Sequence, residues 1–129
     1  MLAIDTNLVV RYLTGDNPEQ AAQARDLIDA NAVFVSTTVL LETEWVLRSV
    51  FAYAAPLIAQ RLRAFAGLPT VTTEDASLAA RALDWMEGGM DFADALHLGK
   101  ASGCTAFVTF DQRLVRAAEA LDAVPARFP

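Results

Sequence analysis

Short apolar stretches alternate along this chain with longer segments of helical periodicity, and few folds are compatible with that alternation. The first segment, Met1–Asn7, begins apolar and changes abruptly to polar at Asp5. An apolar run of this length, followed by residues that cap helices, indicates a buried strand leading into a helix. We expect this strand to be central in a parallel sheet, with the Asp5 carboxylate at its carboxyl end.

The alternation continues to the end of the chain. The later predicted strands are Val33–Val35, Thr70–Thr73 and Ala106–Phe110, with a short edge strand within Ala123–Pro129. The predicted helices are Leu8–Leu13, Glu19–Asn31, Thr38–Val50, Pro56–Ala66, Asp75–Glu87, Asp91–Ser102 and Asp111–Leu121. Short strands alternating with helices indicate an α/β fold, with a short central parallel sheet of four to five strands flanked by helices. In such sheets, ligands bind beyond the carboxyl ends of the strands.

Length and composition indicate one domain, residues 1–129, with a substantial apolar core, since 54% of the residues are hydrophobic. No apolar run approaches the roughly 20 residues that a membrane span requires, and no signal peptide is recognisable. The single cysteine, Cys104, has no partner for an internal disulfide. We therefore expect a reduced, cytoplasmic setting and no membrane association.

The net charge of −6 and the pI of about 4.6 argue against binding nucleic acid through charge alone. Two divalent ions would change −6 to −2, so the acidity is compatible with a metal-dependent nuclease. The one histidine, His97, and the one cysteine cannot form a zinc site of the His/Cys type.

Several acids lie at predicted strand-to-helix transitions. Asp5 is explained either as a helix N-cap or as a ligand, but Thr6 and Asn7 can cap the helix in its place. Asp91, Asp94 and Asp111 also suit helix starts, where caps and first-turn acids are favourable. The three-residue spacing of Asp91 and Asp94 places both carboxylates on one helix face.

Two glutamates of the predicted helix Thr38–Val50 invite different interpretations. Glu44 lies four residues before Arg48, which is the favourable arrangement for an exposed ion pair. Glu42 lies three residues after Val39 and four before Val46, so we expect it near an apolar face. An acid in that position needs a partner or a metal.

Together, Asp5, Glu42, Asp94 and Asp111 form a set of acids near one edge of the predicted sheet. Four carboxylates brought together without a cation repel one another, and some stay protonated. A hard divalent cation removes this conflict, and Mg²⁺ prefers oxygen ligands and suits phosphate substrates.

The motifs that contain these acids resemble those of PIN-domain ribonucleases, especially the VapC-type toxins of bacterial toxin–antitoxin pairs. The motifs are Ile-Asp-Thr-Asn at Ile4–Asn7, Leu-Leu-Glu-Thr-Glu-Trp-Val-Leu around Glu42, Asp-Phe-Ala-Asp-Ala-Leu at Asp91–Leu96, and Val-Thr-Phe-Asp at Val108–Asp111. The resemblance covers essentially the whole chain, in order and at the length typical of the family.

By this resemblance, Asp5, Glu42, Asp94 and Asp111 correspond to the acidic quartet of the family. Asp91 corresponds to a further acid beside the site, and the supporting polar positions are Thr6, Asn7, Ser36 and Thr109. The resemblance implies an Mg²⁺- or Mn²⁺-dependent endoribonuclease that uses a metal-activated water. It also implies a homodimer that is held inactive by an antitoxin protein.

Three other functions share part of this pattern. An aspartate-based phosphotransfer domain also gathers acids at strand ends, but it usually needs a lysine near the late strands, and the only lysine is Lys100, within a predicted helix. A catalytically inert PIN-like module would keep the fold for protein binding. Cleavage of DNA or of structured junctions would use the same site with a different groove.

Basic side chains on neighbouring predicted helices could rim an RNA-binding groove, although a solvated helix surface explains each of them equally well. These side chains are Arg11, Arg48, Lys100, Arg113 and Arg116.

Overall fold

The computed structural model describes all 129 residues, Met1–Pro129. The chain divides into two compact units, Met1–Ala76 and Ser77–Pro129. None of the helices has the combined length and apolar character needed to cross a membrane.

The first unit contains a three-stranded parallel sheet in the order β1-β2-β3. The strands are β1 (Leu2–Ala3), β2 (Val33–Val35) and β3 (Val71–Thr73), with Leu2 opposite Val33 and Val33 opposite Val71. The expectation that the first strand is central is wrong for this sheet. The middle position belongs to β2, whose Val33 and Val35 are completely buried, whereas Leu2 at the edge is 44% exposed.

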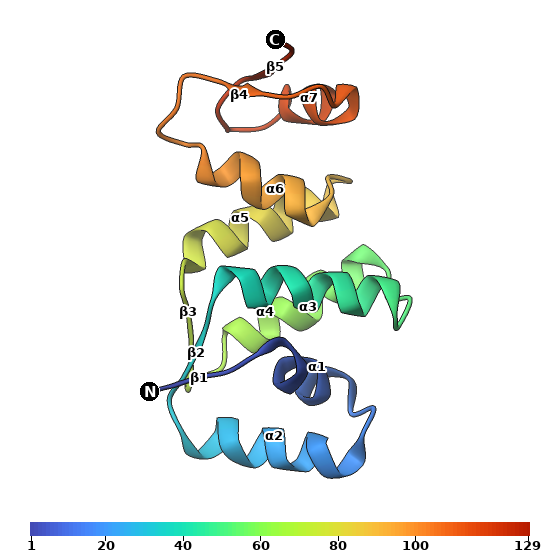
Figure 1. Cartoon of the computed structure of the whole chain (residues 1–129), viewed down its shortest axis with the longest axis vertical. Helices are drawn as coiled ribbons and strands as arrows, with labels where there is room; N and C mark the ends of the chain where they lie inside the picture. Colours follow the sequence, from blue (N-terminus) through green and yellow to red (C-terminus); the bar gives the residue numbers. More distant parts are fainter. The chain divides into compact units, whose positions relative to one another are not determined.

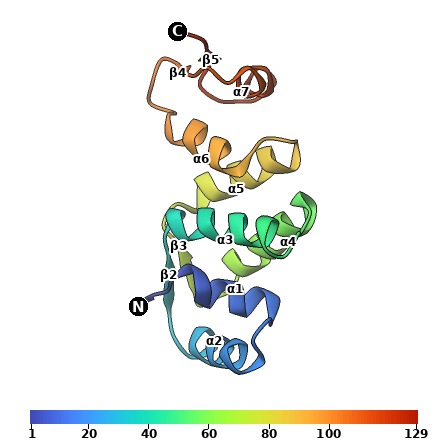
Figure 2. The same cartoon turned by 45° about the vertical axis from the view of Figure 1, so that its right-hand side comes forward.

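Four helices accompany this sheet, and α1 packs between α2 and α3 (Figures 1 and 2). The helices are α1 (Thr6–Thr14), α2 (Pro18–Ala30), α3 (Thr37–Ser49) and α4 (Ala55–Ala66). Gly15 ends α1 in the left-handed conformation, at φ 67°, which costs glycine little. Pro18 then opens α2, where its missing N–H is not needed.

The apolar side chains of these helices form the core of the first unit. Val9 of α1, Ile28 of α2 and Leu47 of α3 are fully buried, and Phe65 of α4 is 1% exposed. The ring of Tyr12 contacts the ring of Phe65 in a tilted arrangement, with centroids 5.6 Å apart. This core holds the start of α1, and therefore Asp5, against its neighbours.

The second unit consists of three helices and a pair of parallel strands. The helices are α5 (Ala76–Glu87), α6 (Phe92–Lys100) and α7 (Gln112–Ala118), and the strands are β4 (Phe107–Val108) and β5 (Ala126–Arg127). A close approach of α5 and α6 occurs at Gly99, which has no side chain to collide with Leu78 and Trp85.

The predicted α/β class with short parallel strands and surrounding helices is confirmed. Five strands form, as the upper end of the prediction required, in groups of three and two. The expected strand in the tail is also present, as β5. The strand β2 matches its predicted stretch, whereas β1, β3 and β4 are shorter than theirs.

Candidate metal centre

Asp5 caps helix α1. Its backbone is extended, with φ −96° and ψ 177°, and its Oδ1 accepts a hydrogen bond from the Leu8 N–H at 3.1 Å. The expectation that Thr6 or Asn7 would cap this helix is wrong, since both are already within it. A single carboxylate oxygen is sufficient for the cap, so Oδ2 remains for another ligand. The side chain is exposed.

Glu42 lies beside the start of α1. Its Oε1 accepts a hydrogen bond from the Thr6 hydroxyl at 3.1 Å, which links α3 to the residue directly after Asp5. The first unit therefore brings two members of the acidic quartet, Asp5 and Glu42, to neighbouring positions. Thr6 orients the Glu42 carboxylate through this hydrogen bond, and its supporting role in a metal site stays a prediction.

The sequence predicted Glu42 near an apolar face and Glu44 in an exposed ion pair, and both predicted exposures are wrong. Glu42 is exposed, whereas Glu44 is only 2% exposed. The Glu44–Arg48 pair does form, with the Arg48 Nε 3.0 Å from Glu44 Oε2 and the Arg48 Nη2 3.3 Å from Oε1. Arg48, one of the cations considered for an RNA groove, thus compensates a buried carboxylate.

The ends of β2 and β3 carry two further polar side chains. Ser36 caps α3 by accepting from the Val39 N–H at 3.2 Å, and its hydroxyl lies 3.0 Å from that of Thr38. Glu74 follows β3 directly, and its Oε1 accepts from the Thr37 N–H at 2.9 Å. Glu74 was missed in the sequence, although an acid that ends a β-branched stretch is the same signal that marked Asp5.

In the second unit, two aspartates cap helices, as their positions indicated. Asp91 caps α6, with its Oδ2 accepting from the Asp94 N–H at 3.2 Å. Asp111 caps α7, with its Oδ1 accepting from the N–H groups of Arg113 at 2.9 Å and Leu114 at 3.1 Å. The Thr109 hydroxyl accepts from the Asp111 N–H at 3.0 Å, which fixes the turn that carries this carboxylate.

Asp94 occupies the most strongly perturbed electrostatic position. Partial burial raises the pKa of its carboxyl group above the ordinary value, and the negative charges of Asp91 and Asp111 raise it further. His97 lowers the same pKa, but this effect is the smallest of the four. Asp91 and Asp111 therefore lie close enough to influence Asp94, and a cation beside Asp94 would relieve this repulsion.

The donor set suits a hard divalent cation, because all the candidate ligands are carboxylate oxygens. Within either unit, no group of three or more histidine, cysteine, aspartate or glutamate side chains is arranged to hold a metal on its own. Asp5 and Glu42 belong to the first unit, and Asp91, Asp94 and Asp111 to the second.

These features define an α/β protein with carboxylates at or near helix starts: Asp5 and Asp111 cap helices that follow strands, and Asp91 and Asp94 lie at the start of α6. The chain belongs to the PIN domain family, whose family model matches residues 2–120. PIN domains are generally nucleases, typically metal-dependent, and usually bind divalent metals. A comparison with curated proteins finds no match.

Proposed function

We propose that this protein is a metal-dependent endoribonuclease and the toxin of a type II toxin–antitoxin pair. The observation that carries the nuclease proposal is the accumulation of negative charge around Asp94, in a chain of the PIN family. The toxin proposal rests on the resemblance of the four acidic motifs to those of VapC-type toxins. By the same resemblance, we propose a homodimer that acts in the cytoplasm and is inhibited by an antitoxin protein.

The proposed ligands of Mg²⁺ or Mn²⁺ are Asp5, Glu42, Asp94 and Asp111, with Asp91 as a further acid beside them. When bound, the cation supplies activation of a water molecule and stabilises the charge that develops on the leaving oxygen.

The chain's own residues prepare this site in specific ways. Thr6 donates to Glu42, so the carboxylate is oriented before any ligand arrives. Asp5 uses one oxygen for the helix cap and keeps the other available. Thr109 fixes the backbone of Asp111, while Asp111 Oδ1 is held by two N–H groups of α7. Because water attacks instead of the ribose 2′-hydroxyl, the products would carry 5′-phosphate and 3′-hydroxyl ends.

The test is RNA cleavage with Mg²⁺, with EDTA, and with the Asp5→Asn variant. We expect cleavage only by the original protein in the presence of the metal, with a loss of at least about a hundredfold in Asp5→Asn. Asp26→Asn, at an exposed position of α2, is the matched control and should cleave normally. Cleavage that survives both EDTA and Asp5→Asn would reject the mechanism.

Further measurements distinguish the remaining functions. Metal binding measured by calorimetry, without cleavage of any RNA pool, would indicate an inert protein-binding module. Transfer of phosphate to Asp5 from a small phosphodonor would indicate a phosphotransfer domain. Cleavage of DNA in preference to RNA would keep the site and change the substrate.

A further inference from the structure

A cleft of about 300 Å³ lies between α1 and α2, entirely within the first unit. Its volume is at the lower end of the range for small-molecule sites. The lining residues are Asn7, Leu8, Arg11, Gln20, Gln23, Ala24 and Leu27. The cleft begins at the first turn of α1, which Asp5 caps, and Leu8 is the residue whose N–H donates to Asp5.

The polar part of the lining consists of side chains that both donate and accept hydrogen bonds. Asn7, Gln20 and Gln23 are exposed, so their amide groups are accessible to a ligand. Leu8, Ala24 and Leu27 supply an apolar wall. An apolar wall beside several amides matches a nucleobase, which has two flat apolar faces and an edge of donors and acceptors.

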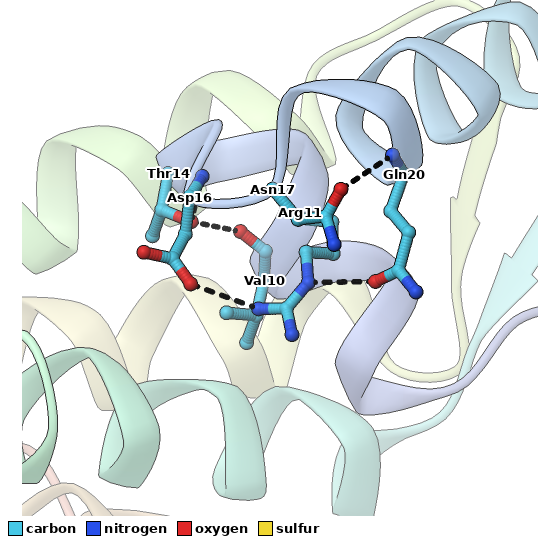
Figure 3. Close-up of polar contacts among 6 residues, drawn as sticks. All are labelled: Val10, Arg11, Thr14, Asp16, Asn17 and Gln20. Atoms are coloured by element: carbon cyan, nitrogen blue, oxygen red, sulfur yellow. Dashed lines mark hydrogen bonds and ion pairs between the residues drawn. The ribbon is translucent and has the colours of Figure 1, made fainter.

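Arg11 gives the cleft its only formal charge. Its Nε donates to Gln20 Oε1 at 2.9 Å, and its Nη1 lies 3.5 Å from Asp16 Oδ2, as Figure 3 shows. These two contacts hold the guanidinium group in place. Because the Gln20 oxygen accepts from Arg11, its amide nitrogen remains as a donor.

The turn between the helices is itself fixed by local hydrogen bonds. The Gln20 N–H donates to Asn17 Oδ1 at 3.1 Å, and the Thr14 hydroxyl donates to the Val10 carbonyl at 2.8 Å (Figure 3). A site that is already ordered loses less entropy when it binds a ligand. No acid lines the cleft, in a chain whose net charge is −6, so a nucleotide would meet no carboxylate on its walls.

We propose that this cleft binds one unpaired nucleobase of the RNA, next to the phosphate that is cut. The proposal rests on the ribonuclease function proposed above and deepens it. The base stacks on the apolar wall and the Arg11 plane, while Gln20 and Gln23 read its edge. Since a paired base presents neither its face nor its Watson–Crick edge, the cleft accepts only an unpaired base.

The test measures RNA binding separately from cleavage, using the full chain in EDTA. The probes are fluorescent single-stranded oligonucleotides that differ in one base, together with a duplex of the same sequence. Gln23→Leu keeps the approximate size of the side chain and removes its hydrogen bonds. Gln60→Leu, at an exposed position of α4, is the matched control. Both positions are exposed, and thermal unfolding checks that both variants remain folded.

We expect the original protein to prefer single strands and to discriminate among the bases. Gln23→Leu should weaken binding of the preferred oligonucleotide by about tenfold and reduce that discrimination, whereas Gln60→Leu should change neither. In the cleavage assay with Mg²⁺, Gln23→Leu should lose its preference for the base next to the cut.

The outcomes distinguish this inference from the proposed function. If the original protein cleaves RNA and Gln23→Leu binds and cleaves with unchanged base preference, the nucleobase site is overturned while the ribonuclease function stands. That result would favour a peptide side chain of a protein partner as the ligand that binds the apolar wall of Leu8 and Leu27. If base-selective binding depends on Gln23 but no cleavage occurs, the site stands and the ribonuclease function fails.

Discussion

Asp5 caps a helix and is also a proposed metal ligand. One carboxylate oxygen accepts from the Leu8 N–H and caps α1, while the other is available for a ligand. Capping requires an oxygen acceptor, whereas metal binding by carboxylates depends on negative charge. The two roles can therefore be separated by substitution.

Two substitutions at Asp5 should separate them. In EDTA, Asp5→Asn should keep nearly all the stability, because asparagine caps helices as well as aspartate does. Asp5→Ala should lower the free energy of unfolding by about 1 kcal/mol. Both variants should lose metal-dependent cleavage. Urea unfolding followed by circular dichroism measures the stabilities, and equal losses in the two variants would argue against the cap.

A pH-dependent effect is expected at Asp94. Its folded pKa is raised above the ordinary value of 3.8, so the folded state holds the proton more tightly than the unfolded state does. The contribution of Asp94 to stability is therefore most favourable at low pH and declines as pH rises from about 3.8 through the raised pKa. In EDTA, Asp94→Asn should become more stable relative to the original protein over that pH range.

The measurement is urea unfolding of both proteins across the acidic range, compared at each pH. Asp26→Asn controls for the loss of one exposed acid. A fall in the stability of Asp94→Asn relative to the original protein as pH rises would contradict the raised pKa. With Mg²⁺ present, the sign should reverse, because the original protein then gains the stabilisation of a bound cation and the variant does not.

The two glutamates of α3 show why burial was difficult to predict from the sequence. The buried positions Leu40, Thr43, Glu44 and Leu47 follow the i, i+3, i+4, i+7 pattern of one helix face. Thr43 and Glu44 on that face are polar, so the positions of the apolar residues alone indicated the wrong side of the helix as the buried one. Their polar atoms are satisfied, since Arg48 donates to Glu44 and the Thr43 hydroxyl donates to the Val39 carbonyl.

At the level of helices and strands, most of the fold could be predicted. The helices form where apolar periodicity and cap residues agree, and β2 matches its predicted range of Val33–Val35. Helix ends were less predictable. The helix expected to reach Ser102 ends at Lys100, because Ala101 takes a cap conformation before Gly103 is reached.

The packing of α5 against α6 gives a prediction for Gly99. A Cβ atom at this position would lie 2.5 Å from a Leu78 methyl group and 3.6 Å from the Trp85 ring. Alanine favours the helix by up to about 1 kcal/mol, but overpacking costs about 1–3 kcal/mol. Gly99→Ala should therefore lower the melting temperature of the protein. Gly103→Ala, where a Cβ meets no atom within 4 Å, is the matched control.

A higher melting temperature for Gly99→Ala than for the original protein would show that Leu78 moves aside easily.

The strand order could not be predicted from the sequence. Whether β1 or β2 is central depends on which distant segments pair, and the short apolar stretches that form them look alike.

At the scale of the whole molecule, the proposed metal site predicts a link between ligand binding and stability. Mg²⁺ at a hundred times its dissociation constant should raise the free energy of unfolding by about 2.7 kcal/mol. EDTA should reverse this gain. Asp5→Asn and Asp94→Asn should each abolish it, since both residues are proposed ligands. Asp26→Asn should retain it.

Thermal unfolding across a magnesium titration measures this link. If Asp94→Asn kept the full gain while Asp5→Asn lost it, the metal would bind through the first unit alone, and the proposed quartet would be wrong. Asp5 and Asp111 could be proposed from sequence because each lies where a strand leads into a helix, whereas Glu42 and Asp94 lie within α3 and α6. The sequence predicted that these acids gather, but it could not predict individual contacts between distant segments, such as the hydrogen bond from Thr6 to Glu42.

The cap formed by Asp5 also has a genetic consequence. Aspartate and asparagine codons differ by one nucleotide, and asparagine satisfies the same helix N–H group. A single transition can therefore silence the proposed nuclease and leave a folded chain that still occupies its partners. Selection against toxicity would be expected to recover Asp5→Asn among full-length, well-expressed survivors, where most inactivating mutations would yield truncated or unstable products.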